Sequence, residues 1–454
     1  MSYLKIISVN SGSSSIKFSV FDFYGDSSVN VNGGNPLSSL LDIDRILSCR
    51  IEEIGTEYGS FYLKDKYQTE TKTQNFADHE TALRYIFKKT RIGDSPLDSA
   101  ADTSASAVES ENRTGSAGGS PPDAVVHRYV HGGRYYIKPL IVGGGDIKKL
   151  SELNELAPLH NPSNLKGLEV TASILPSAKQ ICVFDTAFHG TIPLYAGLYP
   201  VPVECYEKFN IKKYGFHGIS YSFIVNLLKL YKNDSNDKGI EKLIICHLGN
   251  GASVCAVKDG KSIDTSMGYT PLEGLMMGTR SGSIDPEIPF IIKKKLNLTD
   301  DAVVEILNKK SGLLGISKKT YDFKELMKQN DEYAKLALKM YVYRIVKFIG
   351  QYAAVLDGVN ALVFTGGIGE NSDWLRKEVC GNLTYLGINI DDEKNAGAAE
   401  YFRARDPFGR LKVKNSAINI ESKDSAAFVF VVRTDEELQM AFESLTLLDN
   451  LNKK

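Results

Sequence analysis

The sequence has no long hydrophobic run and no excess of charge of either sign. Its 454 residues carry 54 basic and 55 acidic side chains, a net charge of −1, which gives no electrostatic reason to expect nucleic acid or an anionic membrane as a partner. No apolar stretch approaches the ~18 residues that a membrane-spanning helix requires. The first residues lead directly into a strand pattern, without the apolar segment of a signal peptide. We therefore expect a cytoplasmic protein that binds neither nucleic acid nor a membrane.

Cysteine is scarce, and several familiar catalytic signatures are missing. The six cysteines show no CxxC spacing, which predicts reduced thiols rather than disulfides or metal ligands. The sequence also lacks a P-loop, a Rossmann GxGxxG fingerprint, an HExxH zinc motif and a Ser-His-Asp nucleophile elbow. Six of the seven histidines fall between residues 127 and 247, mostly near turn residues. This pattern favours hydrogen bonding over metal binding, and a structural role is the alternative for each of them.

Large apolar side chains are almost absent from residues 93–123. This segment is rich in Ser, Gly, Ala and Asp, so it cannot bury a core, and we expect a disordered surface insertion without a catalytic role. The whole sequence is 43% hydrophobic. The part outside this segment is long enough for two domains with full cores.

The sequence contains two similar strand–turn–strand patterns, at residues 6–23 and 243–257. The first turn, at residues 10–15, offers Ser and Asn side chains and backbone N–H groups to an anion, and Lys17 adds a positive charge. An ordinary polar hairpin is the alternative. Two copies of one unit in opposite halves of the chain suggest a duplicated domain, whose two turns would bind the phosphates of a nucleotide.

Two charged residues have positions that suggest a binding role. Asp185 follows the predicted strand at residues 180–184, and the carboxyl ends of buried parallel strands are where α/β sheets bind ligands; the cap of a turn is the alternative. Arg280 lies in a glycine-rich loop at residues 271–287, from which it could reach a charged ligand. A solvated loop arginine is the alternative.

Two later segments complete the inventory. A predicted strand at residues 361–364 leads through a glycine-rich turn at 365–372 into a helix, an arrangement that is typical of anion and nucleotide binding but weak as a signal. Before the last helix, Thr434 and Glu437 have the spacing of a capping box. Such a cap would occupy Glu437 and leave Glu436 available for Mg²⁺.

Together these features favour phosphoryl transfer. The reaction needs positioning and positive charge rather than covalent machinery, and its transition state spreads charge over three equatorial oxygens. Loop arginines and a histidine donor could stabilise that charge, and Mg²⁺ could bridge the nucleotide phosphates.

Motifs along essentially the whole chain, apart from the insertion, resemble those of the acetate kinase family. They occur in the family's order, which makes the resemblance specific. They are NSGSSSIK at 10–17, HRYVHGG at 127–133, PLHNP at 158–162, FDTAFH at 184–189, YGFHG at 214–218, HLGNGAS at 247–253, EGLMMGTRSGSIDP at 273–286, FTGGIGENS at 364–372 and TDEEL at 434–438.

The resemblance implies an α/β fold of the actin and sugar-kinase superfamily, with two ribonuclease H-like domains, each a βββαβαβα core, around a nucleotide cleft. Residues 1–185, completed by the helix at 438–454, would form the acyl-substrate and phosphate domain. Residues 186–437 would form the nucleotide-binding and dimerisation domain. The implied activity is reversible, in-line, Mg²⁺-dependent transfer of a phosphoryl group from ATP to acetate by a homodimer, giving acetyl phosphate and ADP.

The resemblance also implies catalytic roles for individual residues. Arg128 and Arg280 would bind the carboxylate and the transferring phosphoryl group, and His217 would stabilise the transition state. His160 would assist at the same site, and Asp185 would orient an arginine or support the metal. By role, the remaining residues are Asn10 and Glu436 for Mg²⁺ or its waters, and Val130, Leu159, Phe216 and Pro271 for the acetate methyl group.

For the nucleotide, the resemblance implies contacts from both glycine hairpins and from two later segments. The phosphate-binding residues would be Lys17, Ser13, Ser15, His247, Leu248, Gly249, Asn250 and Gly251. The adenosine site would be lined by Asp322, Phe323, Lys324, Gly367, Ile368, Gly369 and Asn371.

The sequence departs from the family pattern at a few positions. Lys324 stands where the family usually has arginine, and lysine lacks the planar stacking surface of a guanidinium, so base preference is open. Residues 433–435 read Arg-Thr-Asp instead of Pro-Thr-Asn, which leaves the glutamates in place. The intact glycine turn at 366–369 argues against pyrophosphate as the donor. The alternatives are a propionate or butyrate kinase, and a nucleotide-switch ATPase of the same fold.

Overall fold

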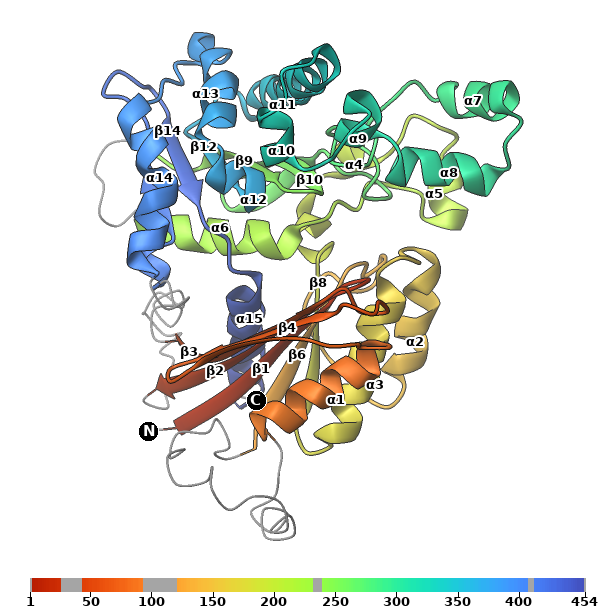
Figure 1. Ribbon diagram of the computed structural model, residues 1–454, viewed down its shortest axis with the longest axis vertical. Helices are drawn as coiled ribbons and strands as arrows, with labels where there is room; N and C mark the ends of the chain where they lie inside the picture. The colour runs from red at the N-terminus through yellow and green to blue at the C-terminus, as the bar shows by residue number, and fades with distance from the viewer. Residues whose placement is uncertain (1, 26–42, 93–120, 232–238, 407–411, 453–454) are drawn as a thin grey trace. The chain divides into compact units, whose positions relative to one another are not determined.

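The computed structural model describes most of the chain, which divides into two compact units. Among the described residues, the first unit comprises those up to 187 and from 435 onwards, and the second comprises those from 188 to 434. The surface insertion expected at residues 93–123 lies outside the described residues, except for its last three positions. The described ranges are 2–25, 43–92, 121–231, 239–406 and 412–452 (Figure 1).

The first unit is built on one mixed sheet of eight strands, in the order β5-β4-β3-β2-β1-β6-β8-β7. β1, β2 and β3 are antiparallel neighbours, whereas β6 and β8 continue the sheet in parallel with β1. The strands are β1 (Ser2–Ser11), β2 (Ile16–Gly25), β3 (Ile43–Glu52), β4 (Ser60–Asp65), β5 (Thr69–Thr73), β6 (Ala124–Tyr129), β7 (Leu140–Ile141) and β8 (Lys179–Phe184).

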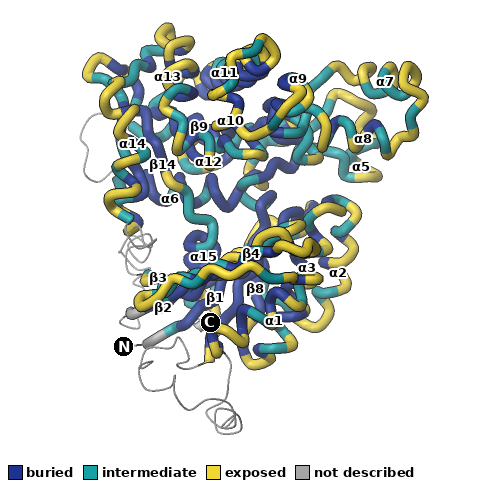
Figure 2. Tube along the Cα trace, in the orientation of Figure 1, coloured by how far each residue is buried: buried dark blue, intermediate teal, exposed yellow. Residues whose placement is uncertain are grey.

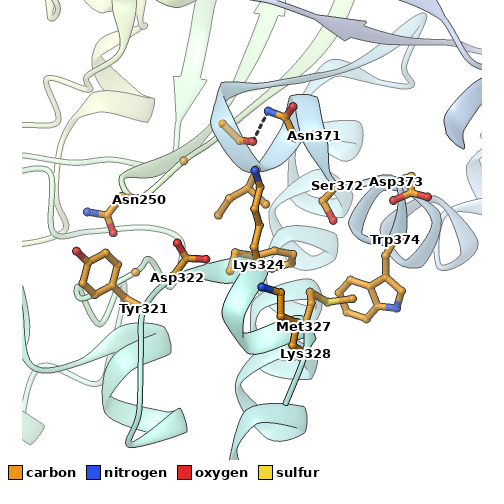
Figure 3. Close-up of a pocket in the computed structure, with 15 residues that line it drawn as sticks. Asn250, Tyr321, Asp322, Lys324, Met327, Lys328, Asn371, Ser372, Asp373 and Trp374 are labelled. Carbon is orange, nitrogen blue, oxygen red and sulfur yellow. Dashed lines mark hydrogen bonds between the residues drawn. The ribbon is translucent and has the colours of Figure 1, made fainter. Parts of the chain in front are cut away.

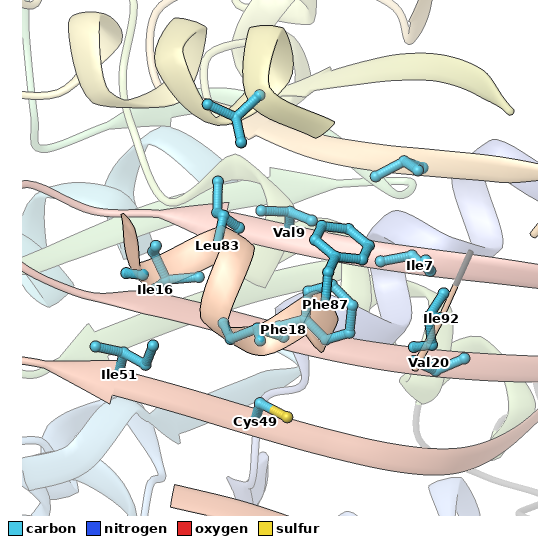
Figure 4. Packing of buried hydrophobic residues seen from close by; sticks show 14 of the residues in the cluster. Ile7, Val9, Ile16, Phe18, Val20, Cys49, Ile51, Leu83, Phe87 and Ile92 are labelled. Carbon is cyan, nitrogen blue, oxygen red and sulfur yellow. The ribbon is translucent and has the colours of Figure 1, made fainter. Parts of the chain in front are cut away.

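Helices cover both faces of this sheet. Because side chains alternate along a strand, Ile7 and Val9 of β1 lie on one face, where they join a core with residues of α1 and α3 such as Phe87 (Figure 4). The opposite face of β1 is therefore the one on which Ser8 and Asn10 lie, and α15 packs there (Figure 1). The helices of this unit are α1 (His79–Thr90), α2 (Asp146–Glu152), η3 (Leu153–Glu155), α3 (Asn161–Ile174) and α15 (Glu436–Asn452).

The second unit repeats the core of the first. Its sheet has the order β11-β10-β9-β12-β14-β13, in which three antiparallel strands again lead to two strands parallel to the first of them. The central orders β3-β2-β1-β6-β8 and β11-β10-β9-β12-β14 correspond strand for strand, so the predicted duplicated α/β fold is confirmed. The strands are β9 (Lys242–Leu248), β10 (Ala252–Lys258), β11 (Lys261–Thr265), β12 (Ala361–Thr365), β13 (Ala417–Asn419) and β14 (Phe428–Val432).

Burial differs strongly among the helices of the second unit. α11 buries an apolar stripe against the sheet, whereas α5 and α7 bury none of their side chains (Figure 2). The helices are α4 (Leu194–Gly197), α5 (Glu204–Phe209), α6 (Gly218–Tyr231), α7 (Ile288–Leu296), α8 (Asp300–Lys309), α9 (Gly312–Ser317), α10 (Phe323–Met327), α11 (Glu332–Leu356), α12 (Gly366–Asn371), α13 (Asp373–Gly381), η6 (Thr384–Leu386), α14 (Asp392–Arg405) and η7 (Val413–Asn415). The 3₁₀ turn η4 (Ala187–Thr191) follows β8.

Candidate active site

Three candidate residues of the first unit lie at the ends of neighbouring strands. Asn10 is near the end of β1, Arg128 is the second-last residue of β6, and Asp185 directly follows β8. The register that pairs Val9 with His127, and Tyr129 with Phe184, brings these strand ends to one edge of the sheet. By alternation, all three side chains lie on the face that α15 covers. The sheet itself therefore assembles this cluster.

Arg128 is held in one orientation by the residues beside it. Its Nε lies 3.2 and 3.1 Å from the two Asp185 carboxylate oxygens, its Nη2 lies 2.5 Å from Oδ2, and its Nη1 donates to Asn10 Oδ1 at 3.2 Å. Burial disfavours the charged guanidinium, but Asp185 and Glu436 more than offset this and raise the pKa of Arg128. The Asp185 side chain is 1% exposed, and its partner is an arginine rather than a helix or turn N–H. A buried, two-point ion pair of this kind fixes a side chain that would otherwise rotate freely.

The predicted capping box at the start of α15 is wrong. Asp435, not Thr434, caps the helix, because its Oδ1 accepts from the backbone N–H of Leu438 at 3.0 Å. Both residue types cap helices well, and a shift of one position moves Glu437 away from the capping position. Glu437 instead lies 3.9 Å from Lys17 Nζ, and this carboxylate raises the pKa of Lys17. Among the described residues, Oε1 of Glu437 is buried without a hydrogen-bond partner.

The turn at residues 10–15, which was predicted to bind phosphate, is anchored by a histidine that the motifs did not single out. His79, the first residue of α1, places its Nε2 2.6 Å from the carbonyl oxygen of Gly12. The backbone N–H of Gly12 also donates to the Ser15 carbonyl at 2.8 Å, and that of Ile54 donates to Ser14. Ser13 remains exposed at the tip of the turn. The turn is thus fixed through its backbone carbonyl and N–H groups, while Ser13 stays exposed.

His217 has a strained backbone in the second unit. Its φ is 59°, in the left-handed region that non-glycine residues rarely adopt. This conformation lies directly before α6 and turns the side chain back towards β10, where Nδ1 is 2.8 Å from Ser253 Oγ. Strain of this kind persists where surrounding contacts enforce it, and it is commonly found at functional sites.

The His217 ring stacks on the ring of His247, with centroids 4.2 Å apart and 19° between the planes. Each ring is also held by a serine hydroxyl at Nδ1. Ser253 holds His217, and Ser220 Oγ lies 2.9 Å from His247 Nδ1 and 2.9 Å from Thr434 Oγ1. His247 is therefore a support for His217, and it does not line the pocket described below.

Arg280 approaches the same place as His217. A Cβ added at Gly251 would lie 3.6 Å from Arg280 Nη1 and 3.6 Å from His217 Nε2, so glycine at this position leaves a space that both groups face. Within the described part of the chain, the hydrogen-bond acceptors of Arg280 are the Pro271 carbonyl oxygen at 3.5 Å and the Met277 sulfur at 3.9 Å. Burial lowers the pKa of Arg280. In contrast to Arg128, no carboxylate in this part of the protein neutralises it.

A cavity of about 600 Å³ opens between α10, α12 and the second glycine hairpin. Figure 3 shows Asn250 and Tyr321 on one side of it and Trp374 on the other, with Asp322 and Lys324 between them. The cavity gathers most of the residues expected at the adenosine site. Its lining is Gly249, Asn250, Gly278, Tyr321, Asp322, Phe323, Lys324, Met327, Lys328, Gly367, Ile368, Asn371, Ser372, Asp373 and Trp374.

Some predicted nucleotide contacts lie outside this lining. Gly369 is buried inside α12, and Leu248 is fully buried in β9. The glycine segment that was predicted as a turn before a helix is itself helical from Gly366 onwards. Conversely, Tyr321, Met327, Lys328 and Trp374 line the cavity and were missed. Trp374 is the only tryptophan in the chain, a large aromatic side chain directly after the glycine motif, and this was the available signal.

The residues expected around the acetate methyl group have different exposures. Val130 is 4% exposed and Phe216 is 2% exposed, whereas Leu159 is 55% exposed. Pro271 is half-buried in the loop that leads to Arg280. His160 is half-buried at the start of α3, where its side chain makes no capping hydrogen bond. Val130, Leu159 and His160 belong to the first unit, and Phe216 and Pro271 belong to the second.

Two other histidines in the predicted cluster have structural roles. His189 is buried between Ser262 Oγ and the carbonyl oxygen of Phe216, at 2.8 and 3.0 Å. His127 is buried against Gln180 and Thr171. For both, burial lowers the pKa to about 4. These rings are therefore neutral at physiological pH and support the fold.

The described residues contain neither a cluster of metal-binding side chains nor a membrane-spanning helix. No group of three or more His, Cys, Asp and Glu side chains is positioned there to hold a metal ion. None of the described helices combines the length and the apolar character needed to cross a membrane.

The sequence matches the model of a known family and is similar to named relatives. The model of the acetokinase family matches residues 5–442. The acetate kinase of Thermotoga maritima is 38% identical over 457 aligned positions, which cover 99% of this chain and 100% of the relative. The chain is thus similar to an acetate kinase along its whole length.

Solved structures give the same result. A crystal structure of Porphyromonas gingivalis acetate kinase superposes with a TM-score of 0.78 at 32% identity and covers 98% of this chain and 100% of its own. A propionate kinase from Francisella tularensis superposes with a TM-score of 0.76 at 34% identity, covering 97% and 98%. These superpositions cover both units.

Proposed function

This chain belongs to the acetokinase family, and on that premise we propose how its residues transfer a phosphoryl group between ATP and acetate. As a member of the family it is a kinase that acts on acetate. The reaction is reversible, and its products are acetyl phosphate and ADP. Each of the two units supplies part of the chemistry.

In the first unit, Arg128 binds the acetate carboxylate. Its guanidinium is planar and is oriented by the buried Asp185 carboxylate, with Asn10 as a third contact. Because the orientation is fixed before substrate arrives, little conformational entropy is lost when acetate binds. Lys17 and the hydroxyls of Ser13 and Ser15 bind nucleotide phosphate oxygens.

In the second unit, Arg280 and His217 stabilise the charge that develops on the transferring phosphoryl group. The two groups face the same space beside Gly251, and no carboxylate in the described part of the protein competes for Arg280. Donors that are already in position need no reorganisation during the reaction, which is the largest contribution that a protein makes to this chemistry. His160 assists at the acyl phosphate.

The cavity beside α10 and α12 binds the nucleoside. Phe323 and Trp374 provide aromatic surface, Asp322 and Lys324 provide polar contacts, and Gly367 at the start of α12 allows the backbone to approach the phosphates. The volume of about 600 Å³ is in the range of ordinary small-ligand sites.

Mg²⁺ fits the carboxylates at the start of α15. The ion keeps several waters and takes only one or two protein carboxylates together with substrate phosphates, which agrees with the absence of a larger ligand cluster in the described residues. Glu436 and Asn10 would hold the ion or its waters, and the buried Glu437 Oε1, which lacks a hydrogen bond within the described chain, is a further acceptor for a metal-bound water. When bound, the ion neutralises phosphate charge.

The observation that carries the proposal is the pairing of Arg280 and His217 around Gly251, next to a hairpin whose Gly249 and Asn250 line the nucleoside cavity. The test is a hydroxamate assay with ATP, Mg²⁺, acetate and hydroxylamine, in which we expect acetyl hydroxamate. Purified protein that binds ATP but forms no hydroxamate would refute the proposal. An ATPase activity that does not respond to acetate would then indicate a nucleotide switch of the same fold.

The similarity to a propionate kinase makes a longer acid the second candidate substrate. One methylene group in an apolar pocket changes the transition-state free energy by only about 1–3 kcal/mol. The same assay with acetate, propionate and butyrate at equal concentrations measures this preference. We expect the highest kcat/KM with acetate.

We also propose that the protein is a cytoplasmic homodimer. Apolar side chains are exposed on α5 and α7, which bury none of their residues, and such a surface favours association with a second copy of the chain. Sedimentation velocity should give a dimer, and Phe290→Asp should give a monomer. The exposed apolar side chains of this region are Leu194, Tyr195, Val203, Phe209, Phe290, Ile291 and Leu296.

A further inference from the structure

A buried tyrosine hydroxyl lies behind the proposed transition-state histidine. Tyr221 is one turn into α6 and is 0% exposed, with its ring against those of His189 and Phe188. Its hydroxyl contacts Ser253 Oγ, and Ser253 Oγ lies 2.8 Å from His217 Nδ1. Three side chains thus form one hydrogen-bonded chain, Tyr221–Ser253–His217, within the second unit.

The direction of this chain follows from counting protons. Within the described part of the protein, the only hydrogen-bond partner of the Tyr221 hydroxyl is Ser253, and the side-chain partners of Ser253 are Tyr221 and His217. If Tyr221 donates to Ser253 and Ser253 donates to His217 Nδ1, every proton has an acceptor. If His217 Nδ1–H donates instead, the proton of Tyr221 or that of Ser253 has none, and a buried donor without an acceptor is unfavourable.

We propose that Ser253, which accepts a hydrogen bond from Tyr221, is the positioning residue that fixes the tautomer of His217, so that its proton is on Nε2. This inference rests on the proposed role of His217. Nε2 is the nitrogen that faces the space shared with Arg280 beside Gly251, so the fixed tautomer presents an N–H donor to the phosphoryl oxygens. The opposite tautomer would present a lone pair to them, and the two would repel each other.

The surroundings of His217 agree with a fixed orientation. Groups that face its ring include His247 of β9 on one face, Arg280 beyond Gly251, and Tyr221 through Ser253. Burial raises the pKa of Tyr221 well above its ordinary value, so its hydroxyl stays protonated. The stack on His247 holds the plane of the ring, and the left-handed backbone of His217 adds a further constraint.

The hydrogen-bonded chain predicts what happens when Ser253 loses its hydroxyl. In the unaltered protein the proton of Ser253 has His217 Nδ1 as its acceptor, so the neutral ring keeps its own proton on Nε2. In Ser253→Ala no donor holds Nδ1, and the neutral ring divides between two tautomers. We therefore expect kcat of Ser253→Ala to fall about twofold at pH 8, with little change in either KM, because an even division halves the share of the competent tautomer.

The direct measurement is ¹⁵N NMR of protein labelled at histidine nitrogen. The unaltered protein should show the Nε2–H tautomer for His217, assigned by comparison with His217→Asn. A signal of the Nδ1–H tautomer would overturn the proposal even if no variant folds. Because this measurement needs no catalysis, its failure is distinguishable from failure of the kinase activity.

Variants separate this arrangement from a structural role. Ser253→Ala should show a signal of the Nδ1–H tautomer beside that of Nε2–H, and Ser253→Thr, which keeps the hydroxyl, should restore the single Nε2–H signal. Tyr221→Phe leaves the Ser253 proton with His217 Nδ1 as its acceptor and should keep the Nε2–H tautomer. Its matched control is Tyr231→Phe, because it removes a tyrosine hydroxyl bonded to the Lys414 carbonyl at the other end of α6. A Ser253→Ala protein with only the Nε2–H tautomer and an unchanged kcat would overturn the proposal.

Discussion

The two arginines of the candidate site have opposite electrostatic surroundings. Arg128 is paired with the buried Asp185 carboxylate, so much of its charge is already compensated and its direction is fixed. Arg280 contacts only a carbonyl oxygen and a sulfur as acceptors in the described part of the chain, and it is partly buried. A positive charge that has lost water without gaining a carboxylate interacts more strongly with an arriving phosphoryl group. The difference suits Arg128 to substrate orientation and Arg280 to transition-state charge.

Arg280→Ala should therefore lower kcat by about 10³-fold or more, the range in which removal of an arginine from phosphoryl transfer falls. The KM for ATP should change by about twofold or less, because Arg280 does not line the nucleoside cavity. Steady-state kinetics with the hydroxamate assay measure both values. Arg403→Ala is the control, since that exposed arginine pairs with Glu400 on the surface of α14 and its removal should leave kcat unchanged. Near-normal turnover of Arg280→Ala would contradict the assigned role.

His79 gives a second prediction at the scale of single residues. Its hydrogen bond to the Gly12 carbonyl anchors the turn that carries Ser13 and Ser15. His79→Leu should raise the KM for ATP about fivefold while the KM for acetate changes little, because one hydrogen bond contributes ~1 kcal/mol. His79→Gln keeps a side-chain N–H donor of similar reach and should recover most of the affinity. Equal KM values for ATP in both variants would show that the hydrogen bond does not position the turn.

At the scale of elements, the strand pattern of the sequence was a good guide. The hairpins at residues 6–23 and 243–257 became β1–β2 and β9–β10, whose apolar residues, such as Ile7, Phe18 and Val254, are buried. The ends of helices were less predictable from the sequence. Thr434 and Asp435 are both suitable caps, and only the actual path of the backbone selects Asp435.

Contacts between distant residues were outside the reach of pattern analysis. His217 and Ser253 are 36 positions apart, and no spacing rule connects residues on a loop and a strand. Similarly, the exposure of Leu159 depends on the turn before α3 and not on its own apolar character. The resemblance located the motifs, but it could not tell which side chains within them hold one another.

The elements around the nucleoside cavity give a prediction that uses the single tryptophan. Trp374 at the start of α13 faces Phe323 of α10, with ring centroids 6.2 Å apart. A purine base in the cavity would alter the surroundings of the indole, so ADP should change its fluorescence intensity in a saturable manner. Trp374→Phe should abolish the signal and raise the KM for ATP about threefold to tenfold, since one base–aromatic contact contributes ~1–3 kcal/mol. Acetate alone should produce no change, and an ADP titration without a fluorescence change would place the base elsewhere.

At the scale of the whole molecule, each unit contains a buried histidine whose ring is neutral. His127 lies in β6 of the first unit and His189 lies in the second. The sequence grouped both with the candidate catalytic histidines, because their neighbours are motif residues. The burial of these two rings cannot be derived from the residues next to them in the sequence, because it depends on α3 and β11, which pack against the rings. We therefore expect both units to lose folding stability at acidic pH for the same reason.

This sensitivity has a definite sign. Burial lowers the pKa of both rings from 6.5 to about 4, so the unfolded chain binds protons between these values while the folded chain does not. The stability that each neutral ring contributes is therefore complete above about pH 6.5 and is lost as the pH falls towards 4, up to about 3 kcal/mol for each histidine. Urea unfolding followed by circular dichroism at several pH values from 7.5 to 4.5 measures this loss.

The comparison that isolates the histidines is with His127→Gln. Carboxylates titrate equally in both proteins, so their contribution cancels in the difference between the two curves. The variant should be less stable than the unaltered protein at pH 7.5, because a shaped buried site is disturbed, but its stability should fall less steeply between pH 6.5 and 4.5, because it takes up one proton fewer on unfolding. Parallel curves would mean that His127 titrates alike in the folded and unfolded chain, and the burial argument would then fail for the first unit.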